Sequence, residues 1–379
     1  MNAPDRGVGG NGARSPRRVA FVSDSVPERN GVGAYYADLV AQLEDRGFES
    51  TFLCPDQARK GLRFPLPGDT TQRIWIPSPR SFGRTIRELA PHAIVVATPG
   101  PYGLLGVRWA RKLGVRLIVG FHTHYAGVTD LYSRSILRVF SRGYFRVADR
   151  VLFRNADHVL GNSEAMVRLA RQLGADDVRR IGTLVPRPVL EAPTRPIGDR
   201  LERVLFAGRL APEKRISEVV SAAERLPGLR FTIAGDGPLL DEVGAAARRL
   251  PNLEATGWLS RAELLEHMDA ADALVLPSEM ESFGTVALEA MARERIAVVT
   301  DTCGIADWPS LAEHLVVFSP ERPLHEVLSG LAEDSPDSLR SLARRAREAA
   351  VDLNRRTLEQ WIGLLSPGQD DHSDESGRS

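Results

Sequence analysis

Two glutamates stand at a spacing that suits a ligand with a diphosphate and a ribose. Glu281 and Glu289 are separated by seven residues, and Phe283, Gly284 and Thr285 lie between them where a predicted helix begins. Gly284 allows the backbone to approach a ligand closely, and the helix start offers free N–H groups to a diphosphate. A carboxylate about one turn into that helix can accept both ribose hydroxyls. The alternative interpretation is a solvated helix face.

Positive charge follows an earlier apolar run at residues 204–206. Arg209, which directly follows Gly208, and Lys214 come soon after this run. A departing diphosphate gains negative charge as a glycosidic bond breaks, and preorganised cations stabilise it by about 3 kcal/mol per contact. These two residues would then stabilise the departing diphosphate in place of a metal ion. An exposed turn explains them equally well.

The elements that must position these residues alternate along the chain. Short β-branched runs predict strands, and the longer amphipathic stretches between them predict helices. Such alternation implies parallel sheets, which bind ligands beyond the carboxyl ends of their strands. The predicted strands are residues 19–22, 51–53, 94–97, 117–121 and 158–160, followed by 204–206, 231–234, 274–276 and 297–300.

A proline-rich stretch divides this alternation into two similar halves. A chain of 379 residues also exceeds what one compact core usually holds. We therefore predict two Rossmann-like domains, 18–186 and 201–352, joined by a linker at 187–200. Disordered tails are expected at 1–17 and 366–379, and a C-terminal helix at 353–365 has an apolar face that could cross back to the first domain.

Composition and charge exclude several classes of protein. Lys plus Arg and Asp plus Glu number 49 each, so no overall basic field is available to hold a nucleic acid. No apolar run approaches membrane-spanning length, and the amino terminus lacks the apolar region of a signal peptide. Two lone cysteines fit a reducing compartment. We expect a cytoplasmic protein.

The combination of motifs resembles the retaining family 4 glycosyltransferases of GT-B fold, over about residues 18–291. That resemblance implies an α/β protein with two Rossmann-like, doubly wound parallel-sheet domains that face a central cleft. The matching residues are Gly208-Arg209 with Lys214, Gly235-Asp236-Gly237-Pro238, Gly257-Trp258, and Glu281-Ser282-Phe283-Gly284-Thr285 with Glu289.

The resemblance also implies roles for individual residues. In such enzymes the Arg and Lys hold the diphosphate, the second Glu holds the ribose, and the first Glu with the Phe-Gly backbone contacts the donor sugar. These roles fall on Arg209, Lys214, Glu289, Glu281, Phe283 and Gly284. Gly235, Gly237 and Trp258 would line the base, Gly31 and Gly33 would lie against phosphate or acceptor, and His122 would help to align the reacting sugar.

Metal ligands and cofactors are not expected. No two aspartates stand at i and i+2, the arrangement that metal-dependent glycosyltransferases use, and His122 with His124 lacks a third ligand nearby in sequence. The nucleotide diphosphate-sugar is then a co-substrate. Since no carboxylate near His122 is marked as a nucleophile, retention favours a same-face displacement in which the departing phosphate takes the acceptor proton.

Arginines recur every four residues from Arg134 to Arg154, among apolar side chains. A spacing of four residues advances about 400°, so this row winds around a helix. The plain interpretation is an amphipathic helix that covers the sheet and shows its arginines to water. The alternative is a segment, 134–154, that lies on an anionic membrane and brings a lipid acceptor to the site.

Two segments depart from the family pattern. Residues 180–186 replace the usual Pro-Asn-Gly-Val-Asp run, and residues 302–307 stand where a Gly-Gly pair is common. Three functions therefore compete: a hexosyltransferase that uses a UDP- or GDP-sugar, a nucleotide-sugar 2-epimerase, and a non-catalytic nucleotide-sugar-binding protein. Arg209 and the Glu281 to Glu289 pattern favour transfer.

Overall fold

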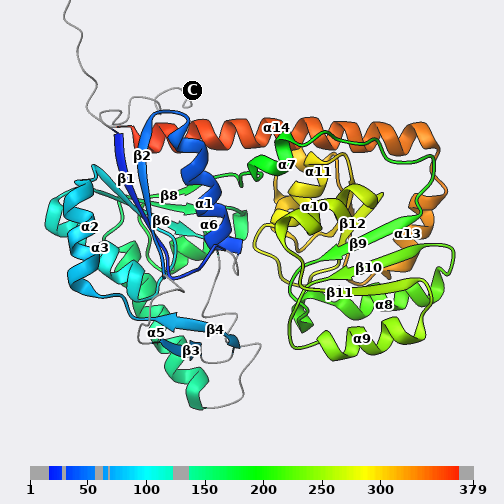
Figure 1. Cartoon of the computed structure of the whole chain (residues 1–379), viewed down its shortest axis with the longest axis horizontal. Coiled ribbons are helices and arrows are strands. Elements are labelled where there is room, and N and C mark those ends of the chain that lie inside the picture. Colours follow the sequence, from blue (N-terminus) through cyan, green and yellow to red (C-terminus); the bar gives the residue numbers. More distant parts are fainter. Residues whose placement is uncertain (1–16, 28–30, 56–62, 67–68, 123–135, 367–379) are drawn as a thin grey trace, which may run out of the picture.

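The computed structural model describes residues 17–27, 31–55, 63–66, 69–122 and 136–366. Two α/β domains lie next to each other, and each contains a six-stranded sheet in which all neighbouring strands are parallel (Figure 1). The two sheets confirm the predicted α/β class with two Rossmann-like domains.

The N-terminal sheet has the strand order β2-β1-β5-β6-β7-β8. A separate antiparallel hairpin and the edge strand β8 were not predicted from the sequence. The strands are β1 Arg17–Val22, β2 Phe48–Leu53, β5 Ala93–Val96, β6 Arg116–Phe121, β7 His158–Gly161 and β8 Val178–Arg180, with the hairpin β3 Arg63–Leu66 and β4 Asp69–Trp75. The helices are α1 Gly31–Glu44, α2 Pro79–Leu89, α3 Pro101–Leu113, α5 Ile136–Phe153 and α6 Glu164–Gln172.

Both faces of this sheet are covered, because successive side chains of a strand point to opposite sides. Ala20 and Val22 of β1 belong to the apolar cluster that contains side chains of α2 and α3. Val19 and Phe21 belong to the cluster on the other side, which contains side chains of α1 and of the last helix. Burial on both faces explains why the central strands are continuous apolar runs.

The C-terminal sheet has the order β11-β10-β9-β12-β13-β14. Its edge strands, β11 and β14, were also missed by the sequence pattern. The strands are β9 Arg203–Ala207, β10 Arg230–Ala234, β11 Leu253–Gly257, β12 Ala273–Leu276, β13 Ile296–Thr300 and β14 Val316–Phe318. The helices are α8 Ile216–Arg225, α9 Leu240–Arg249, α10 Arg261–Ala270, α11 Thr285–Ala292, α12 Pro309–Ala312 and α13 Leu324–Ala332, with the 3₁₀ turns η1 Pro212–Lys214 and η2 Gly304–Asp307.

One long helix, α14 (Pro336–Leu365), runs along both domains (Figure 1). The helix expected at 353–365 is the last part of α14, which begins at Pro336. Its first half packs in the C-terminal core, and its end lies on the N-terminal sheet, where Trp361 is fully buried and donates from Nε1 to the Tyr35 hydroxyl at 2.8 Å. Arg116 donates to the Leu364 carbonyl at 2.8 Å. The C-terminal helix therefore ties the two domains together.

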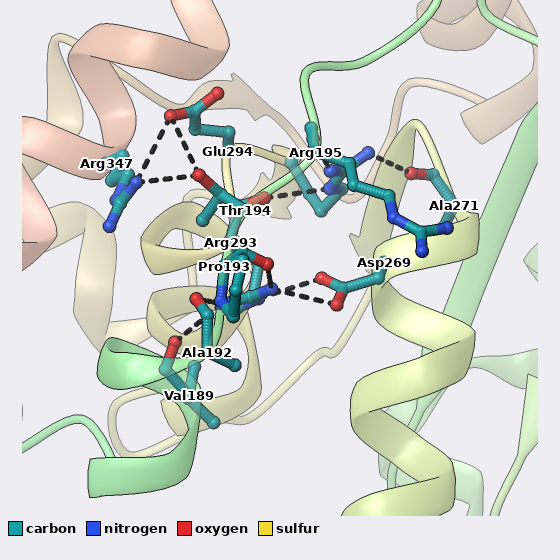
Figure 2. A network of polar contacts seen from close by, with 11 residues as sticks. Val189, Ala192, Pro193, Thr194, Arg195, Asp269, Ala271, Arg293, Glu294 and Arg347 are labelled. Carbon is teal, nitrogen blue, oxygen red and sulfur yellow. Dashed lines mark hydrogen bonds and ion pairs between the residues drawn. The ribbon is translucent and has the colours of Figure 1, made fainter.

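The linker carries a short helix, α7 (Arg187–Glu191), and two buried arginines bind the chain around it to the C-terminal domain (Figure 2). Arg293 is completely buried, and it donates to both carboxylate oxygens of Asp269 at 2.8 Å. Because Arg293 directly follows α11, the linker is attached to the helix that carries Glu289. The linker carbonyls that accept are those of Val189, Ala192 and Pro193 from Arg293, and that of Arg195 from Arg295.

Candidate functional site

The carboxyl ends of four adjacent C-terminal strands bring the predicted motifs to one edge of the sheet. Their loops are joined by backbone hydrogen bonds, from Gly208 N to Ala234 O at 3.0 Å and from Gly235 N to Gly257 O at 2.8 Å. Gly235 has φ of +147°, and a Cβ there would lie 1.8 Å from the Gly208 oxygen. Glycine is therefore required at residue 235 so that the two loops can meet. Gly237 lies in the same loop, close to the Leu210 backbone.

Lys214 and Glu281 meet in an ion pair, Nζ to Oε2. They come from different loops, after β9 and after β12, and the backbone of Glu279 donates to the Glu213 carbonyl at 2.8 Å to hold the loops together. Burial works against the charge on Lys214, but the carboxylate of Glu281 outweighs this effect and raises the pKa of Lys214. A cation is thus fixed beside the start of α11.

The segment before α11 is shaped by Gly284, which has φ of +93°. A Cβ at this position would lie 2.7 Å from the sulfur of Cys303, so a larger residue is excluded both by space and by backbone conformation. Phe283 is buried, and its carbonyl accepts from the backbone N–H of Ile305 at 2.7 Å. Thr285 is the first helical residue, so the free N–H groups of α11 lie next to the Lys214–Glu281 pair.

The loop that contains Cys303 connects this site to the N-terminal domain. The Asp307 carboxylate accepts from the backbone N–H of Glu164, the first residue of α6, at 3.1 Å. Trp308 donates to the Asn162 carbonyl at 2.9 Å, and the Arg180 guanidinium lies 4.0 Å from its ring centre. The segment that departs from the family pattern is therefore a contact between the domains.

Glu289 lies on α11 near charges from both domains. Burial raises the pKa of Glu289 to about 7; Arg261 acts against this rise and Asp38 adds to it. Arg261, the first residue of α10, donates to both carboxylate oxygens of Asp38 on α1, at 2.9 and 2.5 Å. Sequence reasoning missed Asp38 and Arg261, because no local motif connects residues so far apart in the chain.

On the N-terminal side, His122 follows β6, and its Nε2 lies 2.8 Å from the Tyr36 hydroxyl. Burial lowers the pKa of His122 to about 4, so the ring is neutral at physiological pH. Gly33 is needed where α1 passes the preceding loop, because a Cβ would lie 2.8 Å from the Val26 backbone. Gly31 begins α1 and is exposed.

Two other predicted site residues, Arg209 and Trp258, are only partly buried. Arg209 is half-buried in the loop between β9 and η1, and Trp258 follows β11 with 62% of its surface exposed. His124 and Arg134 lie outside the described residues. Among the residues that the structure covers, no three His, Cys, Asp or Glu side chains gather as metal ligands would.

The helix α5 has two distinct faces over its last turns. Phe145, Leu152 and Phe153 are buried, and Leu152 and Phe153 belong to the apolar cluster on one face of the sheet, as the plain interpretation predicts. The other face carries three exposed arginines together with apolar side chains that are 38–61% exposed. These residues are Arg146, Arg150 and, directly after the last helical residue, Arg154, together with Tyr144, Val147 and Val151. Within the described part of the chain, no helix has both the length and the apolar character needed to cross a bilayer.

Two family models match the chain, one for each domain. The model described as "Glycosyl transferase 4-like domain" matches residues 30–182, and the model described as "Glycosyl transferases group 1" matches residues 193–349. A GDP-mannose-dependent alpha-mannosyltransferase of Mycolicibacterium smegmatis is 30% identical over 319 residues, which cover 76% of this chain and 81% of that protein. Its namesake from Mycobacterium tuberculosis is 27% identical over 311 residues, with 76% and 80% coverage.

Solved structures share the two-domain arrangement. Sucrose-phosphate synthase from Thermosynechococcus elongatus superposes with a TM-score of 0.71 at 18% identity, covering 93% of this chain and 98% of that one. Anabaena HepE in complex with UDP-glucose gives a TM-score of 0.68 at 18% identity, with 91% and 99% coverage. At these identities the likeness shows the fold alone.

Proposed function

Because the chain belongs to family 4 of the GT-B glycosyltransferases, the group 1 glycosyl transferases, we propose that it moves a hexosyl unit from a nucleotide diphosphate-sugar to a hydroxyl acceptor, with retention of configuration and without a metal ion. One observation supports this most directly. Lys214, from the loop after β9, pairs with Glu281, and Glu281 belongs to the segment after β12 that continues through the start of α11 to Glu289.

In the proposed reaction, charge builds up on the departing diphosphate. Lys214 stays protonated because its pKa is raised, and the free N–H groups of α11 add the positive end of the helix dipole. Arg209 supplies a second cation from the same loop. These groups stabilise the leaving phosphate without magnesium. Glu289, once ionised, accepts the two ribose hydroxyls and fixes the nucleoside.

Displacement and proton transfer occur on the same face of the sugar in this proposal. The acceptor oxygen forms a bond to the anomeric carbon as the bond from that carbon to the phosphate oxygen breaks. The electron pair of the broken bond stays on the diphosphate, and the acceptor proton moves to the leaving phosphate oxygen. Glu281, with the Phe283–Gly284 backbone, is proposed to hold the donor sugar during this step.

The first donor to test is GDP-mannose, since the two mycobacterial relatives are named as GDP-mannose-dependent mannosyltransferases. The chain is incubated with GDP-mannose and with UDP-glucose, and nucleotide release is measured with and without hydroxyl acceptors and with EDTA. Acceptor-dependent release that survives EDTA supports the proposal, and NMR of the product linkage tests retention. Interconversion of the sugar without an acceptor would indicate an epimerase, and binding without turnover a non-catalytic protein.

For the acceptor we propose a lipid or lipid-linked hydroxyl at the inner face of the membrane. The support is the exposed side of α5, where apolar side chains alternate with arginines. Such a face combines insertion among lipid head groups with attraction to anionic lipid. A cytoplasmic protein with this helix would bind the membrane peripherally.

A further inference from the structure

His122 lies against two aromatic side chains of α1, and an aromatic side chain of α14 packs on one of them. Tyr35 and Tyr36 are consecutive residues of α1, and their ring centres lie 5.2 and 5.5 Å from that of His122. Trp361 of α14 packs on Tyr36 at 6.2 Å and donates to the Tyr35 hydroxyl. The C-terminal helix therefore supports the two tyrosines that contact the histidine.

The Tyr36 hydroxyl and His122 Nε2 are 2.8 Å apart, and both side chains are uncharged. Burial, followed by the neighbouring Tyr35, raises the pKa of Tyr36 well above its usual value, while burial lowers the pKa of His122 to about 4. The tyrosine thus keeps its O–H proton, and the imidazole carries one N–H and one free lone pair.

The available hydrogen-bond partners decide whether the Tyr36 hydroxyl or His122 Nε2 donates. Among the described residues, His122 is the hydrogen-bond partner found for the Tyr36 hydroxyl. If Nε2 carried the proton and donated, the buried phenol proton would be left without an acceptor among these residues, which is costly. If Tyr36 donates to the Nε2 lone pair, its proton is satisfied, and the ring proton must then be on Nδ1.

The backbone of β6 makes room for this contact. A Cβ on Gly120 would lie 1.8 Å from the Tyr36 hydroxyl oxygen and 2.8 Å from His122 Nε2. Any other residue at this position would push the two groups apart. Glycine at residue 120 therefore permits the 2.8 Å distance between the Tyr36 hydroxyl and the ring nitrogen.

We propose that Tyr36 is a positioning residue that holds His122 in the tautomer with its proton on Nδ1. In this form neither ring nitrogen has a free lone pair, because Nε2 accepts from Tyr36 and Nδ1 is protonated. His122 then serves the donor sugar as a hydrogen-bond donor and does not take the acceptor proton. That consequence rests on the proposed transferase function and leaves the departing phosphate as the group that receives the proton.

The tautomer is tested by ¹⁵N NMR of the full chain labelled at its 8 histidines, with His122→Gln identifying the His122 signals. The wild type is expected to show a protonated Nδ1 and an unprotonated Nε2, unchanged between pH 6 and 9. Tyr36→Phe removes the hydroxyl and is expected to abolish this single pattern. Tyr35→Phe is the matched control, because it removes an equally buried hydroxyl that bonds to Trp361 instead.

Kinetics provide the second readout. Tyr36→Phe is expected to lower kcat about tenfold, the equivalent of one lost hydrogen bond, with KM for the donor nearly unchanged. Tyr35→Phe should change kcat less than about twofold, since the His122 hydrogen bond remains. A protonated Nε2 in the wild type, or an identical pattern in Tyr36→Phe, would overturn the inference. The NMR measurement needs no turnover, so an inactive wild type with the expected tautomer counts against the proposed function only.

Discussion

The ion pair between Lys214 and Glu281 shows how the residues of the site are poised before a donor arrives. The family resemblance implies that the two side chains contact different parts of the donor, yet they bind each other in this structure. Each is largely buried, with 16% and 22% of the side chain exposed. A diphosphate that binds Lys214 replaces one anionic partner by another, so the cation stays compensated throughout.

Lys214→Ala is expected to lower kcat/KM for transfer by about 10²- to 10³-fold, because one preorganised cation at a developing charge contributes about 3 kcal/mol. Steady-state kinetics measure the loss. Lys112→Ala is the control, since this exposed lysine lies on α3 of the other domain and outside the proposed site. A Lys214→Ala enzyme within about threefold of the wild type would contradict the assignment, provided that its melting temperature is retained.

The raised pKa of Glu289 predicts that nucleotide binding depends on pH. Its pKa of about 7 means that this carboxylate, which we propose accepts the ribose hydroxyls, is only half ionised at neutral pH. Affinity for a nucleoside diphosphate should therefore rise by up to about tenfold from pH 6 to 8. Calorimetric titration of the wild type and of Glu289→Gln separates this effect from titration of the phosphate, because the glutamine variant keeps only the latter. Parallel pH profiles for the two proteins would refute the prediction.

The same shift has a consequence for stability. The pKa of Glu289 is raised from 4.5 in the unfolded chain to about 7 in the folded chain. Between these values the folded chain holds a proton that the unfolded chain has released. The free energy of unfolding therefore falls as the pH rises from about 4.5 to about 7. In Glu289→Gln the free energy of unfolding should lack this part of the decrease. Urea unfolding measured across the same pH range tests this.

At the scale of elements, burial explains which strands were predictable. The central strands β1, β5, β6, β9, β12 and β13 are buried on both faces, so they are continuous apolar runs. Within the two six-stranded sheets the missed strands are β8, β11 and β14, which lie at sheet edges, where partly exposed positions admit Arg179, Arg180 or Glu254. These three edge strands lack the continuous apolar run that marks the central ones.

The residues of the site also differ in how well the sequence predicts them. Motifs within one loop and its helix, such as Glu281 to Glu289, can be read from spacing, because the backbone alone determines their geometry. Contacts such as Tyr36 with His122 join residues 86 positions apart and depend on how α1 packs on the sheet. No local pattern encodes that packing.

The exposed face of α5 gives a prediction about membranes. Vesicles that contain anionic lipid should carry the chain in a flotation gradient, and purely zwitterionic vesicles should not. Replacing Arg146, Arg150 and Arg154 by alanine should weaken binding about 100-fold, since each arginine near an anionic surface contributes about 1 kcal/mol. The control removes three exposed arginines of the C-terminal domain, Arg248, Arg344 and Arg345. Equal flotation of both triple variants would contradict a role for α5.

At the scale of the whole molecule, contacts of different strength join the domains. The apolar end of α14 is buried on the N-terminal domain, and the buried Arg293 and Arg295 bind the linker to the C-terminal domain (Figure 2). The charges of the Asp38–Arg261 pair act on Glu289, and the Arg261 side chain is 56% exposed. A contact of this kind can break and form again as a nucleotide enters or leaves.

Substitutions of the two members of this pair are expected to have opposite effects on nucleotide affinity. Arg261 favours the ionised form of Glu289, so Arg261→Gln should weaken binding of a nucleoside diphosphate at pH 6.5. Asp38 disfavours that form, so Asp38→Asn should strengthen binding at pH 6.5, and both effects should shrink at pH 8.5, where Glu289 is ionised in every variant. Calorimetry at the two pH values measures both.

Asp45→Asn serves as the control for Asp38→Asn. Asp45 also pairs with an arginine, Arg187 of the linker, but it has no part in the surroundings of Glu289. Its substitution should leave the affinity unchanged at both pH values. If Asp38→Asn and Arg261→Gln both weaken binding, and by the same factor at pH 6.5 and 8.5, the pair acts as a bridge that holds the domains in place. In that case the charge on Glu289 does not depend on it.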